Sequence, residues 1–126
     1  ADVLIIAEGN MAEKAVDAAV ILKWSGKRAI VVSPGSVKPV FESDEAVIKD
    51  FVRTCKRVLT VEDNVTTGGF GSIIEELLEG TGAVVEKHGW PDKFVEHGTR
   101  EELEKKYGLD AAGIAERAGK LIERKA

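Results

Sequence analysis

The sequence has little of several residue types on which common functional classes depend. Among its 126 residues are 1 cysteine, 2 histidines and only 6% aromatic residues. A single cysteine, Cys55, excludes a disulfide framework within the chain and any cysteine-based metal cluster. The two histidines, His88 and His97, leave few groups for acid–base catalysis or for metal ligation.

Long hydrophobic runs and an excess of positive charge are also missing. The apolar runs are too short to span a bilayer, and the N-terminus lacks the basic region of a signal peptide. The chain has 18 Lys+Arg against 22 Asp+Glu, whereas a dedicated nucleic-acid binder normally carries a basic patch. We therefore expect a cytoplasmic protein that binds neither membranes nor nucleic acid.

Enough apolar sequence is present for one packed domain. Hydrophobic residues make up 44% of the chain and charged residues 32%, a balance typical of globular proteins. Neither a linker nor a low-complexity tract interrupts the sequence. Residues 1–126 are therefore predicted to form a single domain.

Short apolar runs alternate with segments of helical periodicity along the chain. Asn10 is expected to cap the first helix, whose apolar face is predicted to include Ala15, Val16 and Leu22. Later helices are expected to be capped by Ser43 or Asp44, by Thr99 in a capping box with Glu102, and by Asp110. This alternation predicts an α/β fold, a three-layer αβα sandwich with a mostly parallel sheet of about five strands. The predicted strands are residues 3–7, 29–32, 57–61 and 83–85, with a short edge strand at Phe94-Val95.

A glycine-rich turn follows the third predicted strand. Gly68, Gly69 and Gly71 allow sharp bends, and the helix that starts at Gly71-Ser72 presents free N–H groups. One interpretation is a phosphate or carboxylate site; the other is a tight turn that allows close approach of a neighbouring chain. The turn lacks the lysine of a nucleoside-triphosphate loop.

Two adjacent carboxylates, Glu62 and Asp63, end the same strand. Open α/β sheets place ligands at the carboxyl ends of their strands, so a metal site or a general base is conceivable there. Adjacent strand residues point to opposite faces, however, which makes them a poor catalytic pair. A capping or turn role is the favoured interpretation.

The region around residues 88–98 contains the remaining chemically distinctive side chains. His88 and His97 flank a predicted loop, and for them a hydrogen-bonded structural role is favoured over a general base. Trp90 and Phe94 lie in this loop, and Trp24 lies late in the first helix. These aromatics either form an exposed patch for another domain or subunit or cover the edges of the core.

Six motifs are distributed over essentially the whole chain. They are Leu4-Ile5-Ile6-Ala7-Glu8-Gly9, Val37-Lys38-Pro39, Val58-Leu59-Thr60-Val61-Glu62-Asp63-Asn64, Gly68-Gly69-Phe70-Gly71-Ser72, residues 89–98 and residues 108–114. Together they resemble the motifs of one known family, the C-terminal domain of thiamine-diphosphate-dependent transketolases. The final third looks most like 1-deoxy-D-xylulose-5-phosphate synthases. Two features depart from the family pattern: Val40-Phe41-Glu42 follows Lys-Pro, and Pro34-Gly35 stands before that turn.

The resemblance implies what the chain does and what it lacks. In the family, thiamine diphosphate and Mg²⁺ are held by other domains, so this domain is expected to bind no cofactor or metal alone and to carry no catalytic residue. Its expected partners are the other domains or subunit of the same enzyme, as a homodimer. Glu62, Asp63, Trp90, Phe94 and His97 are the candidate interface, and Gly68, Gly69, Gly71 and Ser72 the candidate close-contact turn or anion site.

Three alternatives stay open at this point. The chain could be an autonomous small-molecule or anion-binding regulatory module with its site at Gly71-Ser72. It could be the C-terminal domain of a 2-oxo-acid dehydrogenase β subunit. It could also be a complete enzyme that uses Glu62, Asp63 or His97, although the sequence shows no complete active site.

Overall fold

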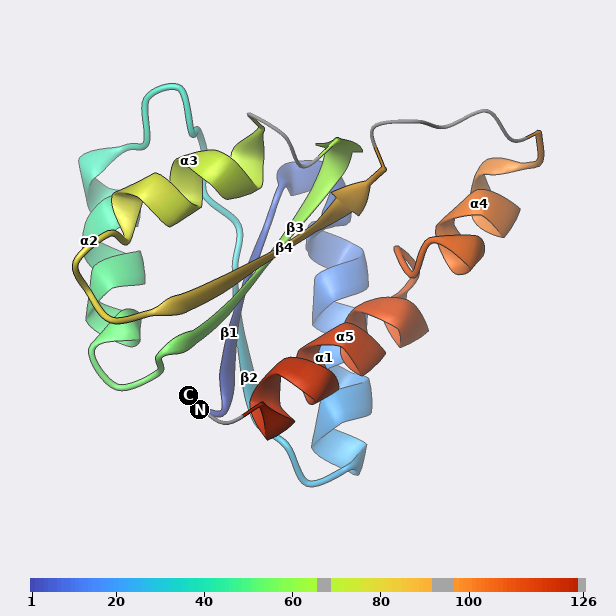
Figure 1. The fold of residues 1–126 in the computed structure, drawn as a ribbon, viewed down its shortest axis with the longest axis horizontal. Coiled ribbons are helices and arrows are strands. Elements are labelled where there is room, and N and C mark those ends of the chain that lie inside the picture. Colours follow the sequence, from blue (N-terminus) through green and yellow to red (C-terminus); the bar gives the residue numbers. More distant parts are fainter. Residues whose placement is uncertain (66–68, 92–96, 125–126) are drawn as a thin grey trace.

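One sheet of parallel strands organises the protein (Figure 1). The computed structural model describes residues 1–65, 69–91 and 97–124. In the described residues the sheet has four strands in the order β2-β1-β3-β4, and every neighbouring pair is parallel. The strands are β1 (Val3–Ala7), β2 (Ala29–Val32), β3 (Arg57–Val65) and β4 (Val84–Trp90).

Helices cover both faces of this sheet, which confirms the three-layer αβα architecture. One face packs against α1 (Ala12–Trp24) and α5 (Ala111–Glu123), and the other against α2 (Glu42–Val52) and α3 (Phe70–Leu77). A 3₁₀ turn, η1 (Gly9–Met11), joins β1 to α1, and α4 (Arg100–Lys106) precedes α5. Among the described residues, no helix combines the length and apolar character needed to cross a membrane.

The central strand β1 separates two hydrophobic cores. All five of its residues are completely buried. Because successive strand side chains point to opposite faces, Val3 and Ile5 join the core under α1 and α5, whereas Leu4 and Ile6 join the core under α2 and α3. The predicted strand at residues 3–7 is therefore confirmed, and its continuous apolar sequence fits burial on both faces of the sheet.

Two of the strands differ from the prediction in length. β3 continues to Val65 rather than ending at residue 61, and β4 covers Val84–Trp90 rather than residues 83–85. Trp90, predicted to lie in a loop, is therefore the last residue of a strand. The predicted fifth strand at Phe94-Val95 lies outside the described residues. The ends of β3 and β4 were hard to predict from the sequence because both strands continue into polar residues.

Two of the predicted helix caps are confirmed and two are wrong. Neither Ser43 nor Asp44 caps α2, which begins at Glu42 with Phe41 before it. The Thr99 hydroxyl accepts a hydrogen bond from the Glu102 N–H at 3.1 Å, and Asp110 accepts one from the Gly113 N–H at 2.8 Å. Asn10 does not cap α1, because η1 intervenes and the residue before the helix is Met11. The side-chain amide of Asn10 instead donates a hydrogen bond to the Asp63 carboxylate at 3.5 Å.

The buried face of α1 agrees with the prediction at Ala15 and Leu22 but not at Val16. Ala15, Ala18 and Leu22 pack against the sheet, whereas Val16 is 51% exposed. Both faces of this helix are rich in apolar residues, so periodicity alone did not identify the inner one. The outward face of α1 therefore remains apolar.

Candidate functional site at the carboxyl ends of the strands

Glu62 near the end of β3 is a completely buried carboxylate that binds the start of α3. One carboxylate oxygen accepts a hydrogen bond from the Phe70 N–H at 3.0 Å, and the other accepts one from the Gly71 N–H at 3.1 Å. These N–H groups belong to the first turn of α3, where the helix dipole favours a negative charge. The anion held by this helix is thus a side chain of the protein itself.

Burial makes the Glu62 carboxyl harder to ionise. Desolvation raises the pKa of Glu62, and the hydrogen bonds from Gly71 and Phe70 oppose that rise. The neighbouring Glu8 carboxylate also raises this pKa, whereas Lys87 lowers it. Close beneath the helix start, the Thr60 hydroxyl oxygen is fully buried and has no hydrogen-bond partner among the described residues.

The candidate turn residues lie around this carboxylate. A Cβ at Gly71 would be 2.6 Å from the Thr60 hydroxyl oxygen and 3.0 Å from a Glu62 carboxylate oxygen, so this position has no room for a side chain. Gly69 is the residue immediately before α3, and Ser72 lies in its first turn. Gly68 lies outside the described residues. An external anion at this turn would have to replace Glu62.

Asp63 points to a different set of partners. Its carboxylate accepts hydrogen bonds from the Arg100 guanidinium at 2.6 Å and from the Trp90 indole N–H at 2.8 Å. Its backbone N–H donates to Glu8 at 3.0 Å. Burial alone would raise the pKa of Asp63, but the hydrogen bonds from Trp90, Arg100 and Asn10 outweigh it and lower the pKa.

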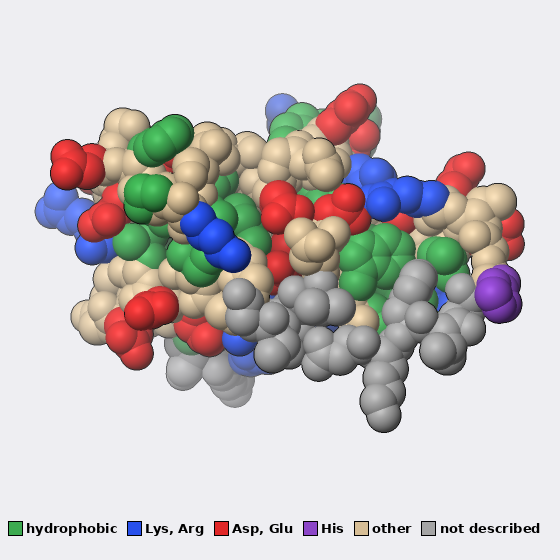
Figure 2. All heavy atoms as spheres, turned by 90° about the horizontal axis from the view of Figure 1, so that it is seen from above, with side chains coloured by type: hydrophobic (Ala, Val, Ile, Leu, Met, Phe, Trp, Pro, Cys, Tyr) green, Lys and Arg blue, Asp and Glu red, His purple; other side chains and the backbone are tan. Residues whose placement is uncertain are grey.

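The two adjacent carboxylates therefore act separately. Glu62 closes the connection from β3 to α3, whereas Asp63 joins β3 to β4, η1 and α4. This arrangement follows from the alternation of side chains along a strand and agrees with the favoured structural interpretation of the pair. Figure 2, which views the molecule from the side toward which β3 ends, shows acidic side chains gathered near the middle of this face with basic ones beside them.

Trp90 is part of the same cluster rather than of an exposed patch. Its ring makes an edge-to-face contact with Tyr107 at 5.9 Å, and the Arg100 guanidinium lies 5.8 Å from the ring centre. With the Asp63 hydrogen bond, these contacts hold α4 and the following segment against the end of β4. The other candidate aromatic of this region, Phe94, lies outside the described residues.

The two histidines occupy different environments. His88 is a buried residue of β4 whose Nε2–H donates to the Gly108 carbonyl at 2.6 Å, which supports the predicted structural role. Burial lowers the pKa of His88, partly opposed by that hydrogen bond. His97 is exposed just before α4. Cys55 is buried and free.

The described residues contain no group of three or more His, Cys, Asp or Glu side chains able to hold a metal ion.

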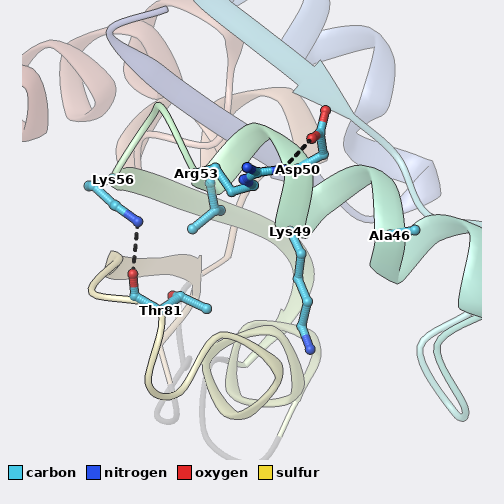
Figure 3. Close-up of a pocket in the computed structure, with 7 residues that line it drawn as sticks. Ala46, Lys49, Asp50, Arg53, Lys56 and Thr81 are labelled. Carbon is cyan, nitrogen blue, oxygen red and sulfur yellow. Dashed lines mark hydrogen bonds and ion pairs between the residues drawn. The ribbon is translucent and has the colours of Figure 1, made fainter.

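A shallow pocket of about 450 Å³ lies at the other end of the sheet, between α2 and the turn before β4 (Figure 3). Its Lys56 ammonium donates to the Thr81 carbonyl at 2.8 Å, and Arg53 faces Asp50 at 3.8 Å. The Lys49 ammonium extends away from Lys56, so these cations do not converge on one anion.

The sequence and the fold match a known family. The family model described as "Transketolase, C-terminal domain" matches residues 1–114. The chain belongs to the transketolase C-terminal domain family. Among curated relatives, the chain is 46% identical over 116 residues to a 1-deoxy-D-xylulose-5-phosphate synthase of Caldanaerobacter subterraneus subsp. tengcongensis, covering 90% of this chain and 18% of the relative. It is 42% identical over 124 residues to 1-deoxy-D-xylulose-5-phosphate synthase 2 of Geobacter sulfurreducens, covering 96% and 19%.

Solved structures give the same family. A split gene transketolase described as an inactive β4 tetramer superposes with a TM-score of 0.88 at 36% identity, over 99% of this chain and 40% of that one. A transketolase from Pichia stipitis superposes with a TM-score of 0.72 at 26% identity, over 97% and 16%. The chain thus spans less than half the length of the proteins that it matches. The resemblance drawn from the motifs is confirmed.

Glu62, Asp63 and Trp90 were predicted from the sequence as candidate residues, but the side chains that they contact were not. Arg100, Glu104 and Lys14 were not singled out, although Glu104 pairs with Lys14 at 2.9 Å and with Arg100 at 3.2 Å. The spacing of four residues between Arg100 and Glu104 is a helical signal that could have revealed one of these pairs. The contact with Lys14 carries no local signal, because 90 residues separate the partners in the sequence.

Proposed function

We propose that the chain is the non-catalytic C-terminal domain of a thiamine-diphosphate-dependent transferase of the 1-deoxy-D-xylulose-5-phosphate synthase type, and that it contributes domain packing and homodimer assembly. The observation that carries the proposal is the similarity to curated synthases, at 46% and 42% identity over most of the chain.

The contacts at the strand ends support a structural rather than a chemical role. A general base or a metal ligand needs lone pairs directed at a substrate or ion. Here the Glu62 carboxylate accepts from two backbone N–H groups, and the Asp63 carboxylate accepts from Trp90 and Arg100. These donors already orient both groups toward the protein.

The carboxylates at the end of β3 and the start of α3 do not fit thiamine diphosphate and Mg²⁺. A diphosphate–Mg²⁺ pair needs oxygen ligands for the metal and free N–H or cationic groups for the phosphates. The N–H groups of Phe70 and Gly71 hold Glu62, and Asp63 holds Arg100. We therefore place cofactor binding in the part of the relatives that this chain does not cover.

The same hydrogen bonds weigh against an autonomous anion-binding module. An anion arriving at Gly71-Ser72 would compete with a carboxylate that is covalently part of the protein and already in place. Displacing Glu62 would also leave its charge buried without donors, at a cost of several kcal/mol. The structural interpretation of the turn is favoured for this reason.

A domain exchange tests the proposal. The C-terminal domain of the Caldanaerobacter synthase is replaced by this chain, and formation of 1-deoxy-D-xylulose 5-phosphate is measured. We expect the chimera to be active, the synthase without its C-terminal domain to be much less active, and the isolated chain to show neither turnover nor saturable binding of thiamine diphosphate by calorimetry. Turnover or tight cofactor binding by the isolated chain would overturn the proposal.

A further inference from the structure

The helix α4 buries little apolar surface, unlike α5, which follows it. Leu103 is the only apolar residue of α4 and is half-buried, whereas the one buried side chain of this helix is the acidic Glu104. The residues that α5 buries are apolar or small: Ile114, Ala115, Ala118, Gly119 and Leu121. Figure 1 shows α4 at the margin of the molecule, beyond α5. We call residues 99–107, which comprise α4 and its two caps, the α4 arm.

A chain of ion pairs holds the α4 arm in place. The Arg100 guanidinium binds the Asp63 carboxylate of β3 at 2.6 Å and the Glu104 carboxylate at 3.2 Å. Glu104 also pairs with the Lys14 ammonium of α1 at 2.9 Å. The side chains of Asp63 and Glu104 are only 13% and 8% exposed, so both acids depend on these cations to offset the cost of leaving water. The inner face of the arm is therefore attached through charge.

The position of Arg100 shows that its cation serves contacts outside the helix. Arg100 is the first residue of α4, where the helix dipole disfavours a positive charge. Glu101 and Glu102, which follow it, have the sign that the dipole favours. What Arg100 reaches from this position is the Asp63 carboxylate and the Trp90 ring, whose centre lies 5.8 Å from the guanidinium. These tertiary contacts explain a cation at an otherwise unfavourable place.

A glycine lies on each side of the α4 arm. Gly98 precedes it, and Gly108, with φ at 71°, follows it in a conformation that favours glycine. Beyond the arm the chain is fixed: the Gly108 carbonyl accepts the Nε2–H of His88 at 2.6 Å, and Leu109 is completely buried. Backbone rotation at the two glycines can thus move the arm while α5 stays in place.

We propose that the α4 arm opens as a unit about Gly98 and Gly108 while the sheet and both cores stay folded, and that ionic strength sets the open fraction. Salt screens ion pairs at the surface but does not weaken apolar burial. Elements with few apolar contacts open at a lower free energy than the whole domain. Opening uncovers the Asp63 carboxylate and the Trp90 ring at the edge of the sheet where α/β proteins bind ligands. This device is independent of the proposed function.

Hydrogen–deuterium exchange of the 126-residue chain tests the opening. Solutions of about 0.01 M and about 1 M sodium chloride change the Debye length from about 30 Å to about 3 Å. In the high-salt solution the peptide that contains residues 99–107 should exchange at least about tenfold faster, whereas peptides of α5 should keep their rate. The proposal fails if the arm exchanges equally in both solutions, or if the arm and α5 accelerate together.

Arg100→Gln separates docking of the arm from the stability of the helix itself. This variant should exchange in low salt as fast as the unmodified arm does in high salt, and salt should accelerate it little further. Removing a cation from the first turn should by itself stabilise the helix, so faster exchange reports the lost tertiary contacts. Lys105→Gln is the matched control, because Lys105 lies on the same helix and has no ion-pair partner within the described part of the chain. Equal exchange of the arm in the two variants would overturn the proposal.

Trp90 provides a second measurement that needs no change in the arm. Trp24→Phe leaves Trp90 as the sole tryptophan, and Trp24 is 87% exposed, so its replacement does not disturb the core. Quenching of Trp90 fluorescence by acrylamide, a neutral quencher that salt does not screen, should increase in high salt because Arg100 leaves the ring. Far-UV circular dichroism should stay unchanged between the two solutions. Constant quenching would contradict opening of the arm at Trp90.

Discussion

Two regions differ in whether their side chains find partners within the chain: the carboxyl ends of the strands and the outer face of α1. At the strand ends, Glu62 and Asp63 each bind several donors of the same chain. On α1, Trp24 is 87% exposed and Asp17 and Lys23 lack ion-pair partners within the described residues. The charged side chains at the strand ends thus bind one another and the backbone, whereas the exposed side chains on α1 are mostly apolar.

This difference shows why position in a fold does not establish function. The carboxyl ends of a parallel sheet are where α/β proteins usually place their ligands. Here the acidic and basic groups at those ends join the turn, the strands and α4 to one another. The surface that remains available for a partner is on a helix that carries none of the candidate site residues.

The largest effect is expected from filling the space at Gly71. Its Cβ would be 2.6 Å from the Thr60 hydroxyl and 2.8 Å from the Lys87 side chain, so Gly71→Ala should lower the free energy of unfolding by about 3 kcal/mol. Gly119→Ala in α5 is the control, because there the nearest atom is the flexible end of Lys27 at 3.4 Å. The control should be neutral or stabilising by up to about 1 kcal/mol. Equal urea unfolding curves for both variants would contradict the closed packing around Glu62.

Removing the Glu62 carboxylate should have the next largest effect. Glu62→Ala leaves the Phe70 and Gly71 N–H groups without acceptors in a buried place, which should cost about 2 kcal/mol. Glu62→Gln keeps the shape and one carbonyl acceptor, so it should cost less. Urea denaturation measures both variants. A glutamine variant less stable than the alanine variant would contradict the capping role.

The buried His88 should make stability depend on pH in a defined direction. Because its pKa is lowered in the folded protein, the unfolded chain takes up a proton first as the pH falls below 6.5. His88 therefore contributes stability above pH 6.5 that is lost as the pH falls toward its folded pKa. At neutral pH the free energy of unfolding of the unmodified chain should exceed that of His88→Gln by about 1 kcal/mol, and the difference should shrink as the pH falls below 6.5. His97→Gln, an exposed control, should not change this dependence.

The smallest effect on stability is expected on the open face. Trp24→Ala removes a side chain that is 87% exposed, so the free energy of unfolding of the monomer should change by less than about 0.5 kcal/mol. Urea denaturation at low protein concentration measures it. A loss of several kcal/mol in the dilute monomer would mean that Trp24 belongs to the core of the chain.

Local patterns were enough to predict much of this protein. Neighbouring residues were enough to predict the strand β1, the caps at Thr99 and Asp110, the αβα layers and the family resemblance. A helix cap and an apolar strand each depend on residues only a few positions apart in the sequence. The helical region at residues 12–24 was also evident, but not which of its apolar faces is buried.

Tertiary structure alone decided where the polar groups of the site find their partners and which surface stays open. Asp63 meets Arg100, 37 residues away in the sequence, and Glu62 meets Gly71 across a turn that matches no local capping motif. The rotation of α1 is likewise determined by how Ala15, Ala18 and Leu22 fit against β1 and α5. Such contacts depend on the packing of whole elements, whereas the sequence around each residue specifies only the conformation of its own segment.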